Sequence, residues 1–253
     1  QSFAVLDAFY ELGGRMIDTA EGYTSFIPGN VGGESETILG QWFDARGVRK
    51  DMLIATKTGM GGPPLALKPD AIRMAFAGSL ERLRTDYVDL YHAHRDDKTT
   101  PLDEVVDVYD ELLQSGQARE LGASNYTAER LSEIVGVAER LGKAHYTVLQ
   151  PKYNLIWRHD FEGPLQDLCL AKGIAVTPYY GLASGFLSGA TASSRSRMSA
   201  SAPESRAFSI RSGRSPGTNS KDSKVMPGSD AAGPSAGTGT RSRHAGSAVH
   251  AGK

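Results

Sequence analysis

Up to Gly189, short apolar runs alternate with stretches of helical periodicity, and this alternation constrains the fold more than any other feature of the sequence. Runs that fit β-strands lie at residues 16–20, 52–57, 87–94, 118–124, 147–154 and 174–180. A helical pattern separates each pair, and one more precedes the first run. Strands that recur every 25 to 40 residues or so, with helices between them, pair in parallel through right-handed crossovers. The sequence therefore predicts an α/β fold.

Polar side chains stand where several of these strands end. They are Asp18, Lys57, His94, Ser124, Asn125 and Gln150. In a (β/α)₈ barrel of the TIM type, the carboxyl ends of all strands converge on the face that carries the active site. A doubly wound sheet would gather only the ends near its switch point. The pattern therefore favours the barrel for residues 1–189.

The composition changes abruptly after Gly189. Residues 190–253 are rich in Ser, Ala, Gly and Arg, and carry ten basic against three acidic residues. Such a segment buries too little apolar surface to offset the entropy of ordering it, so we expect a disordered tail. Its positive charge favours nonspecific rather than specific contact with nucleic acid, because aromatic interleaving and a folded motif are lacking. The abrupt change also resembles a shifted reading frame.

The composition as a whole is that of a soluble protein, with a formal net charge of −1. The lack of an apolar run of 18 residues argues against a membrane span, and Gln1 is not followed by a leader pattern. Cys169 is the single cysteine, and it lies in a helical pattern that predicts a buried apolar role. We therefore expect a cytoplasmic protein. Its oligomeric state is not indicated.

Four of the polar residues suggest acid–base chemistry. Asp18 and Lys57 end neighbouring parallel strands, where each charge would be costly to bury unless the two pair. Tyr23 follows Asp18 in the next loop, and an adjacent ammonium would stabilise its phenolate and lower its pKa. His94 adds a second group able to hydrogen-bond a substrate oxygen. These residues predict a site in which Lys57 makes Tyr23 a better proton donor.

A family resemblance rests on segments that occur in order along residues 1–189: "IDTAEGY", "IATK", "DLYHAH", "GASN", "LQPKYN" and "PYYGLASGFLSG". Together they resemble the aldo-keto reductases, which are NADPH-dependent enzymes built on a (β/α)₈ barrel. The stretch "EGYTSFIPGNVGGESETILG" is similar to a bacterial branch of that family. The resemblance implies an oxidoreductase that transfers hydride from NADP(H) to a small aldehyde or ketone.

The resemblance also implies roles for individual residues. The family's catalytic tetrad corresponds to Asp18, Tyr23, Lys57 and His94, with Tyr23 as proton donor, and no metal takes part. The cofactor-binding residues would be Asp18, Ser124, Asn125, Gln150, Tyr179, Leu182, Ser184, Gly185 and Leu187. Of these, Ser124, Asn125 and Gln150 would hold the nicotinamide carboxamide, Tyr179 would stack on its ring, and the later residues would follow the pyrophosphate.

The sequence departs from the family pattern at both ends. The family's first strand would precede residue 2, and no eighth strand is recognisable after Gly189. We therefore expect a barrel truncated to about six βα units, with open edges and without the family's basic site for the adenosine 2′-phosphate. Weak or absent turnover would follow.

Two other functions remain open. His92 and His94 lie two apart on a strand, and with Asp96, Asp97 and His159 they could form the site of a metal-dependent barrel hydrolase. That interpretation leaves Asp18, Tyr23 and Lys57 without roles. The second alternative is a catalytically weak relative that binds the nucleotide and turns over little.

Overall fold

The computed structural model describes residues 1–60 and 67–189. The chain divides into two units, Gln1–Ser201 and Ala202–Lys253, and all described residues belong to the first. The predictions for residues 190–253, including disorder and a shifted reading frame, lie outside the described residues.

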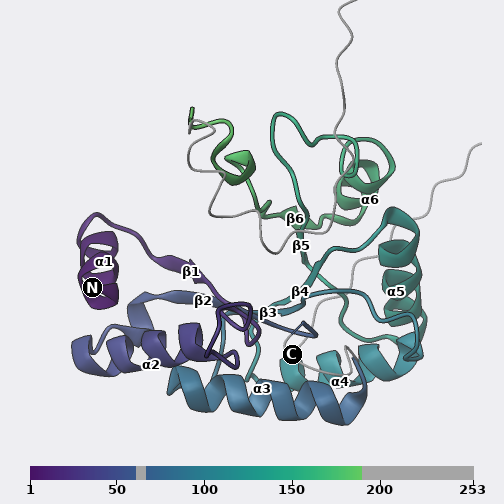
Figure 1. The fold of residues 1–253 in the computed structure, drawn as a ribbon. Helices are drawn as coiled ribbons and strands as arrows, with labels where there is room; N and C mark the ends of the chain where they lie inside the picture. The colour runs from purple at the N-terminus through teal and green to yellow at the C-terminus, as the bar shows by residue number, and fades with distance from the viewer. Residues whose placement is uncertain (61–66, 190–253) are drawn as a thin grey trace, which may run out of the picture. The chain divides into compact units, whose positions relative to one another are not determined.

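The described strands form one parallel sheet in the order in which they occur in the sequence (Figure 1). They are β1 (Met16–Asp18), β2 (Leu53–Thr58), β3 (Leu90–Ala93), β4 (Leu121–Ser124), β5 (Val148–Gln150) and β6 (Ala175–Val176). Each strand pairs with the next along the chain, so the order never reverses as it would in a doubly wound sheet. The predicted truncated barrel is confirmed for the described residues, and its strands are shorter than the apolar runs suggested.

Helices alternate with the strands and lie on the outer face of the curved sheet (Figure 1). They are α1 (Ser2–Glu11), α2 (Glu34–Arg46), α3 (Pro69–Leu83), α4 (Leu102–Gln114), α5 (Ala128–Leu141) and α6 (Pro164–Lys172), with 3₁₀ turns at Arg49–Asp51 and Ala183–Gly185. Pro69 begins α3, a position that suits proline because the N–H it lacks would have no partner in the first helical turn. Thr127 accepts a hydrogen bond from the backbone N–H of Arg130 and so caps α5.

The hydrophobic core lies between the sheet and its helices. Trp42 and Phe43 of α2 are buried in it, and Cys169 of α6 is buried as the sequence predicted. Phe76 of α3 packs edge-on against Tyr91 of β3, with ring centroids 4.5 Å apart. Burial of such rings is the main stabilising contribution here, since each removes on the order of 150 Å² or more of surface from water.

The opposite, inner face of the sheet carries the polar strand residues. Lys57, His92 and Gly122 are partners in register on three neighbouring strands, so their side positions point the same way. A β-carbon on Gly122 would lie 2.4 Å from the His92 ring, which explains why this position has no side chain. The alternation of the strands therefore separates an apolar layer from a layer of ionisable groups.

A buried carboxylate connects α2 to the sheet. Glu36 accepts hydrogen bonds from Thr56 of β2 at 2.5 Å and from the Arg82 guanidinium of α3 at 2.7 Å. Glu36 also lies in the first turn of α2, where a negative charge is favourable beside the helix dipole. Because its side chain is fully buried, the paired guanidinium is what makes the charge tolerable.

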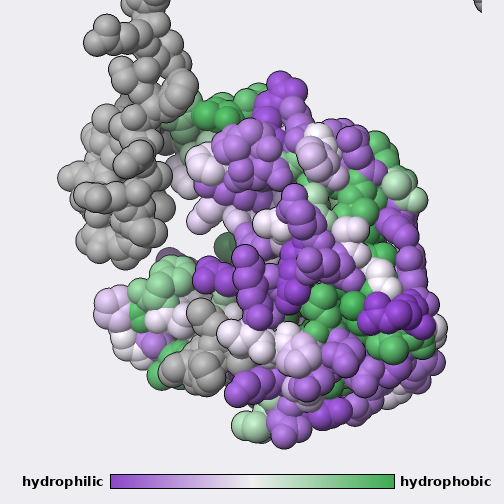
Figure 2. All heavy atoms as spheres, turned by 90° about the vertical axis from the view of Figure 1, so that its right-hand side faces the viewer, coloured by the Kyte–Doolittle hydropathy of each residue, from purple (hydrophilic) through white to green (hydrophobic). Residues whose placement is uncertain are grey.

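Polar side chains prevail on the face of the molecule shown in Figure 2, with smaller hydrophobic groups between them. Lys143 and Asp107 illustrate the charged contacts between the α4 and α5 regions, at 2.6 Å. In the part of the chain that the structure describes, no helix has the length and apolar character needed to cross a membrane.

Candidate active site

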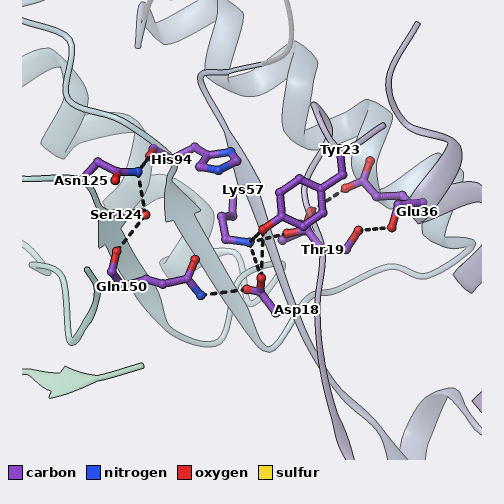
Figure 3. A network of polar contacts seen from close by, with 11 residues as sticks. Asp18, Thr19, Tyr23, Glu36, Lys57, His94, Ser124, Asn125 and Gln150 are labelled. Carbon is purple, nitrogen blue, oxygen red and sulfur yellow. Dashed lines mark hydrogen bonds and ion pairs between the residues drawn. The ribbon is translucent and has the colours of Figure 1, made fainter. Parts of the chain in front are cut away.

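Asp18, Lys57 and Tyr23 form a closed set of contacts at the carboxyl ends of β1 and β2 (Figure 3). The Lys57 Nζ donates to Asp18 Oδ2 at 2.6 Å and to the Tyr23 hydroxyl at 2.9 Å. The Tyr23 hydroxyl donates to Asp18 Oδ2 at 3.2 Å. The structure therefore brings together three residues that the sequence places 39 positions apart at most.

Backbone pairing and one acidic residue hold this cluster in place. Register pairs Asp18 with Ala55, two residues before Lys57, and the Thr19 carbonyl accepts a further hydrogen bond from Lys57 Nζ at 2.8 Å. The loop that carries Tyr23 is held by Glu34, which accepts from the Thr24 hydroxyl and from the backbone N–H of Val31. Tyr23 is therefore positioned by the start of α2 as well as by its own partners.

His94 follows β3 and faces Tyr23. The two rings meet edge to face with centroids 5.8 Å apart. The backbone N–H of His94 donates to the Thr58 carbonyl at 2.8 Å, which fixes the residue beside the end of β2. Its buried Nδ1 has no hydrogen-bond partner among the described residues, so a polar group remains available next to the phenol.

The predicted nicotinamide residues form a second network beside the first (Figure 3). The Gln150 amide donates to Asp18 Oδ1 at 3.1 Å, and the Ser124 hydroxyl donates to the Gln150 carbonyl at 2.9 Å. Asn125 donates to the His94 carbonyl and accepts from the Tyr179 hydroxyl at 2.6 Å. Asn125 adopts a left-handed φ of 60°, which turns the chain at this point.

The loop predicted to follow the pyrophosphate is closed by backbone hydrogen bonds of its own. Leu182, Ser184, Gly185 and Leu187 do not line the cavity beside Tyr23. The backbone N–H groups of Gly185 and Leu187 both donate to the Leu182 carbonyl, at 3.0 and 3.2 Å. In this conformation those two groups are satisfied within the loop, so their role at a pyrophosphate stays a prediction.

A cavity of about 760 Å³ opens beside the cluster. The predicted residues that line it are Tyr23, His94, Ser124, Asn125, Gln150 and Tyr179. Pockets for small organic ligands are usually of this size, and they place a few polar groups in a largely apolar lining. Both networks therefore reach one space large enough for a ligand.

The ionisation of Tyr23 differs from the expectation. Burial raises the pKa of Tyr23 above its usual value, and the charge of the Asp18 carboxylate, which accepts a hydrogen bond from the phenol, raises it further. The expected decrease was wrong because the sequence could not show that Asp18 contacts both Lys57 and the phenol. Burial lowers the pKa of Lys57, although Asp18 counteracts this. The protein thus holds Tyr23 as a neutral phenol.

From two buried histidines, His92 and His94, we expect the fold to lose stability on mild acidification. Burial, followed by the nearby Lys57, lowers the pKa of His92 to about 3 and of His94 to about 4. An unfolded histidine has a pKa of about 6.5, so between that pH and about 4 the unfolded chain binds more protons than the folded one. The free energy of unfolding therefore decreases as the pH falls through this window.

Urea unfolding at pH values between 7 and 5 measures this effect. We expect the midpoint to fall steadily with pH, and to fall less in a His92→Leu variant. The carboxylates with lowered pKa, such as Asp97 at about 2, lose their contribution only at lower pH, because unfolded carboxyls titrate near 4. Equal slopes in both proteins would contradict the prediction.

The metal site considered for His92 and His94 is not assembled. Asp96 is paired with Arg130 at 2.9 Å, and Asp97 accepts from Thr100 and from a backbone N–H. Within residues 1–60 and 67–189, no cluster of three or more His, Cys, Asp or Glu side chains is suited to hold a metal ion. Asp96 and Asp97 instead stabilise the loop after β3 through these contacts.

Several residues at the cavity were missed by the sequence reasoning. The residues that line it without having been predicted are Gly22, Thr24, Ser25, Phe26, Ser35, Met60, Arg95 and Tyr180. Glu21 was missed too, and it accepts from the Thr58 hydroxyl and from the backbone N–H of Gly59 at 2.7 and 2.8 Å. Position directly after a predicted strand was the available signal for Glu21 and Arg95, and Met60 follows a predicted strand by three residues.

The fold and the site define a protein of the parallel (β/α)-barrel type with a Tyr–Lys–Asp–His cluster at the carboxyl ends of its strands. The sequence matches the model of the aldo/keto reductase family over residues 1–228, so the chain belongs to that family. The match extends past Gly189, where the resemblance of the individual motifs ends.

Three curated relatives, one from a plant and two from fungi, illustrate the similarity. The chain is 35% identical over 190 residues to a probable voltage-gated potassium channel subunit beta of Oryza sativa subsp. japonica, covering 74% of this chain and 56% of the relative. It is 32% identical to the norsolorinic acid reductase stcV of Emericella nidulans, covering 73% and 48%. It is 30% identical to an aryl-alcohol dehydrogenase [NADP(+)] of Phanerodontia chrysosporium, covering 73% and 49%. The chain thus spans about half the length of these relatives.

Proposed function

We propose that this protein catalyses the NADPH-dependent reduction of an aldehyde or ketone to an alcohol. The observation that carries the proposal is the contact set of Tyr23, Lys57 and Asp18 beside a cavity of about 760 Å³. Two relatives whose names describe a reductase and an NADP(+)-dependent dehydrogenase support it. The single cysteine in 253 residues is compatible with action in the cytoplasm.

The residues present fit a nicotinamide cofactor. The cavity offers the aromatic face of Tyr179 and the amides of Asn125 and Gln150, which match a flat ring with a carboxamide. The unpartnered Nδ1 of His94 shows that the polar groups here are not all satisfied within the protein. The dinucleotide supplies the hydride when bound. Asn125, Gln150 and Tyr179 would hold it.

The chain's own residues would position the carbonyl and supply a proton. Tyr23 is held as a neutral phenol, so it has a proton to give at physiological pH. The Lys57 ammonium already donates to the phenol oxygen, so it would stabilise negative charge that develops there as the proton leaves. Asp18 neutralises and orients Lys57, and His94 would orient the carbonyl oxygen. Each of these roles is positional or electrostatic.

A second candidate is a catalytically weak relative that binds the nucleotide. The observation that favours it is the similarity to a protein whose name makes it a probable subunit of a potassium channel. We propose on this basis, as the alternative, that the chain binds the nucleotide and a protein partner and turns over little.

Incubation of the purified 253-residue chain with NADPH and benzaldehyde separates these functions. The proposal expects benzyl alcohol to form in step with NADPH oxidation, and deuterium from 4-deuterated NADPH to appear in the alcohol. Slow turnover would agree with the truncation expected from the sequence. Fluorescence titration that shows NADPH binding without any alcohol would favour the second candidate. If the chain neither binds NADPH nor forms alcohol, both candidates are contradicted.

A further inference from the structure

The cavity beside Tyr23 has an uneven distribution of charge. Of the described residues that line it, Arg95 is the only one with a full formal charge at neutral pH. The pKa of His94 is lowered to about 4, mainly by burial, so its imidazole is neutral there. Asp18 and Lys57 are not among the lining residues, and they neutralise each other through an ion pair of 2.6 Å. The ligand-accessible surface therefore carries one positive charge.

The Arg95 guanidinium is available to bind an anionic group. Its side chain is exposed, and it makes no hydrogen bond or ion pair with any residue of the described ranges 1–60 and 67–189. The next two residues in the sequence are both acidic, yet neither neutralises it. Asp96 is bound by Arg130 at 2.9 Å, and Asp97 accepts from Thr99 and Thr100. Both carboxylates therefore have partners other than the Arg95 guanidinium.

The position of Arg95 relates it to the reacting groups. It directly follows His94, whose backbone is fixed by a hydrogen bond from its N–H to the Thr58 carbonyl. The positive charge of Arg95 acts on both His94 and Tyr179. A group bound by Arg95 would therefore belong to a molecule that also reaches the carbonyl-binding end of the cavity.

Apolar side chains complete this part of the lining. Phe26, Met60 and Tyr180 line the same cavity, and Phe26 exposes 78% of its surface. Exposed aromatic surface at a cavity is stabilised when an apolar ligand covers it. The combination selects a ligand with an apolar body and an anionic group, since a guanidinium binds a carboxylate through two parallel hydrogen bonds.

We propose that Arg95 determines specificity for carbonyl substrates that carry a carboxylate on an aromatic or apolar framework. The inference rests on the proposed reductase function. It adds a charge requirement to the substrate class, and it assigns that requirement to one residue outside the tetrad.

Two aldehydes that differ in charge test this directly. The probes are 4-carboxybenzaldehyde and its methyl ester, methyl 4-formylbenzoate. In the wild-type chain we expect kcat/KM to favour the carboxylate by about tenfold, the value of one well-formed charged contact of about 1.4 kcal/mol. The preference should diminish as salt is added, because the guanidinium is exposed.

Variants assign the preference to Arg95. Arg95→Gln should remove the difference between the two aldehydes, and Arg95→Lys should retain part of it, since an ammonium lacks the fork of donors. Arg140→Gln is the matched control, because Arg140 is an exposed arginine at the end of α5, outside the cavity. It should keep the wild-type ratio. If Arg95→Gln leaves the ratio of the two kcat/KM values unchanged, the proposal is overturned. It is also overturned if the variant loses activity equally with both aldehydes and binds NADPH more weakly, because Arg95 would then be a cofactor contact.

Direct binding keeps this test separate from that of the reductase function. Calorimetric titration of the NADP⁺-loaded protein with benzoate and with methyl benzoate needs no turnover. If the wild-type protein binds benzoate more tightly than methyl benzoate and Arg95→Gln abolishes the difference, the assignment of Arg95 is supported even when no aldehyde is reduced. The lack of reduction would then contradict the proposed reductase function alone. Equal reduction of both aldehydes by the wild-type chain, with equal binding of both benzoyl probes, would overturn the assignment and leave the reductase intact.

Discussion

We expect the Tyr23→Phe variant to lose carbonyl reduction by about 10²- to 10⁴-fold in kcat/KM, the range typical for removal of a positioned proton donor. The variant removes one oxygen. That oxygen accepts from Lys57 Nζ at 2.9 Å and donates to Asp18 Oδ2 at 3.2 Å. The phenylalanine ring can keep the edge contact with His94, so the shape of the cavity should be preserved. The loss should therefore appear in turnover rather than in folding.

Steady-state rates with benzaldehyde and a fluorescence titration with NADPH measure the two effects separately. Tyr153→Phe is the matched control, because its hydroxyl donates to Glu162 at 2.7 Å and it does not line the cavity. We expect the control to retain the wild-type rate, and Tyr23→Phe to retain NADPH binding. A Tyr23→Phe variant that reduces benzaldehyde as fast as the control would remove the phenol from the mechanism.

The second large effect concerns stability. We expect Gly40→Ala to destabilise the fold by about 2 kcal/mol or more, toward the upper part of the range for overpacked interiors. Gly40 lies on α2, where an added β-carbon would be 2.2 Å from the Arg82 carbonyl oxygen and 2.8 Å from the Leu83 carbonyl carbon. Both are backbone atoms at the end of α3, so the clash cannot be relieved by rotating a side chain. The two helices would have to separate.

Gly136→Ala offers the opposite result from the same substitution. Gly136 lies in α5 with no atom within 4 Å of the added carbon, and alanine in an exposed helix is favoured over glycine by about 1 kcal/mol. Urea unfolding of both variants should therefore shift the midpoint down for Gly40→Ala and up for Gly136→Ala. Similar midpoints for the two would show that α2 and α3 do not pack as closely as described.

The sequence predicted the architecture because its signals were local. Apolar runs separated by helical patterns required parallel pairing, and Asp18 and Lys57 at adjacent strand ends had to lie close together. The limits of the strands were less well predicted, since apolar residues such as Val88 are buried just outside β3. Periodicity records burial, whereas a strand is defined by its hydrogen bonds.

Other features depended on contacts distant in sequence. The direction of the Tyr23 pKa follows from burial and from Asp18, neither of which can be read from the residues around Tyr23. Arg95 stands beside two aspartates, so the sequence suggests a neutralised cluster. Only the fold shows that Asp96 reaches Arg130 on α5. Buried Glu36 was likewise hidden, because its partners Thr56 and Arg82 come from a later strand and a later helix.

The contact of Glu36 with Thr56 has a practical consequence for substitutions on the outer helices. Thr56 and Lys57 are joined by one peptide unit and project to opposite faces of β2. The guanidinium of Arg82 is thus two hydrogen bonds and one peptide unit away from the ammonium that touches Tyr23. Helix substitutions introduced to improve solubility or expression should accordingly be screened for enzymatic rate as well as for melting temperature.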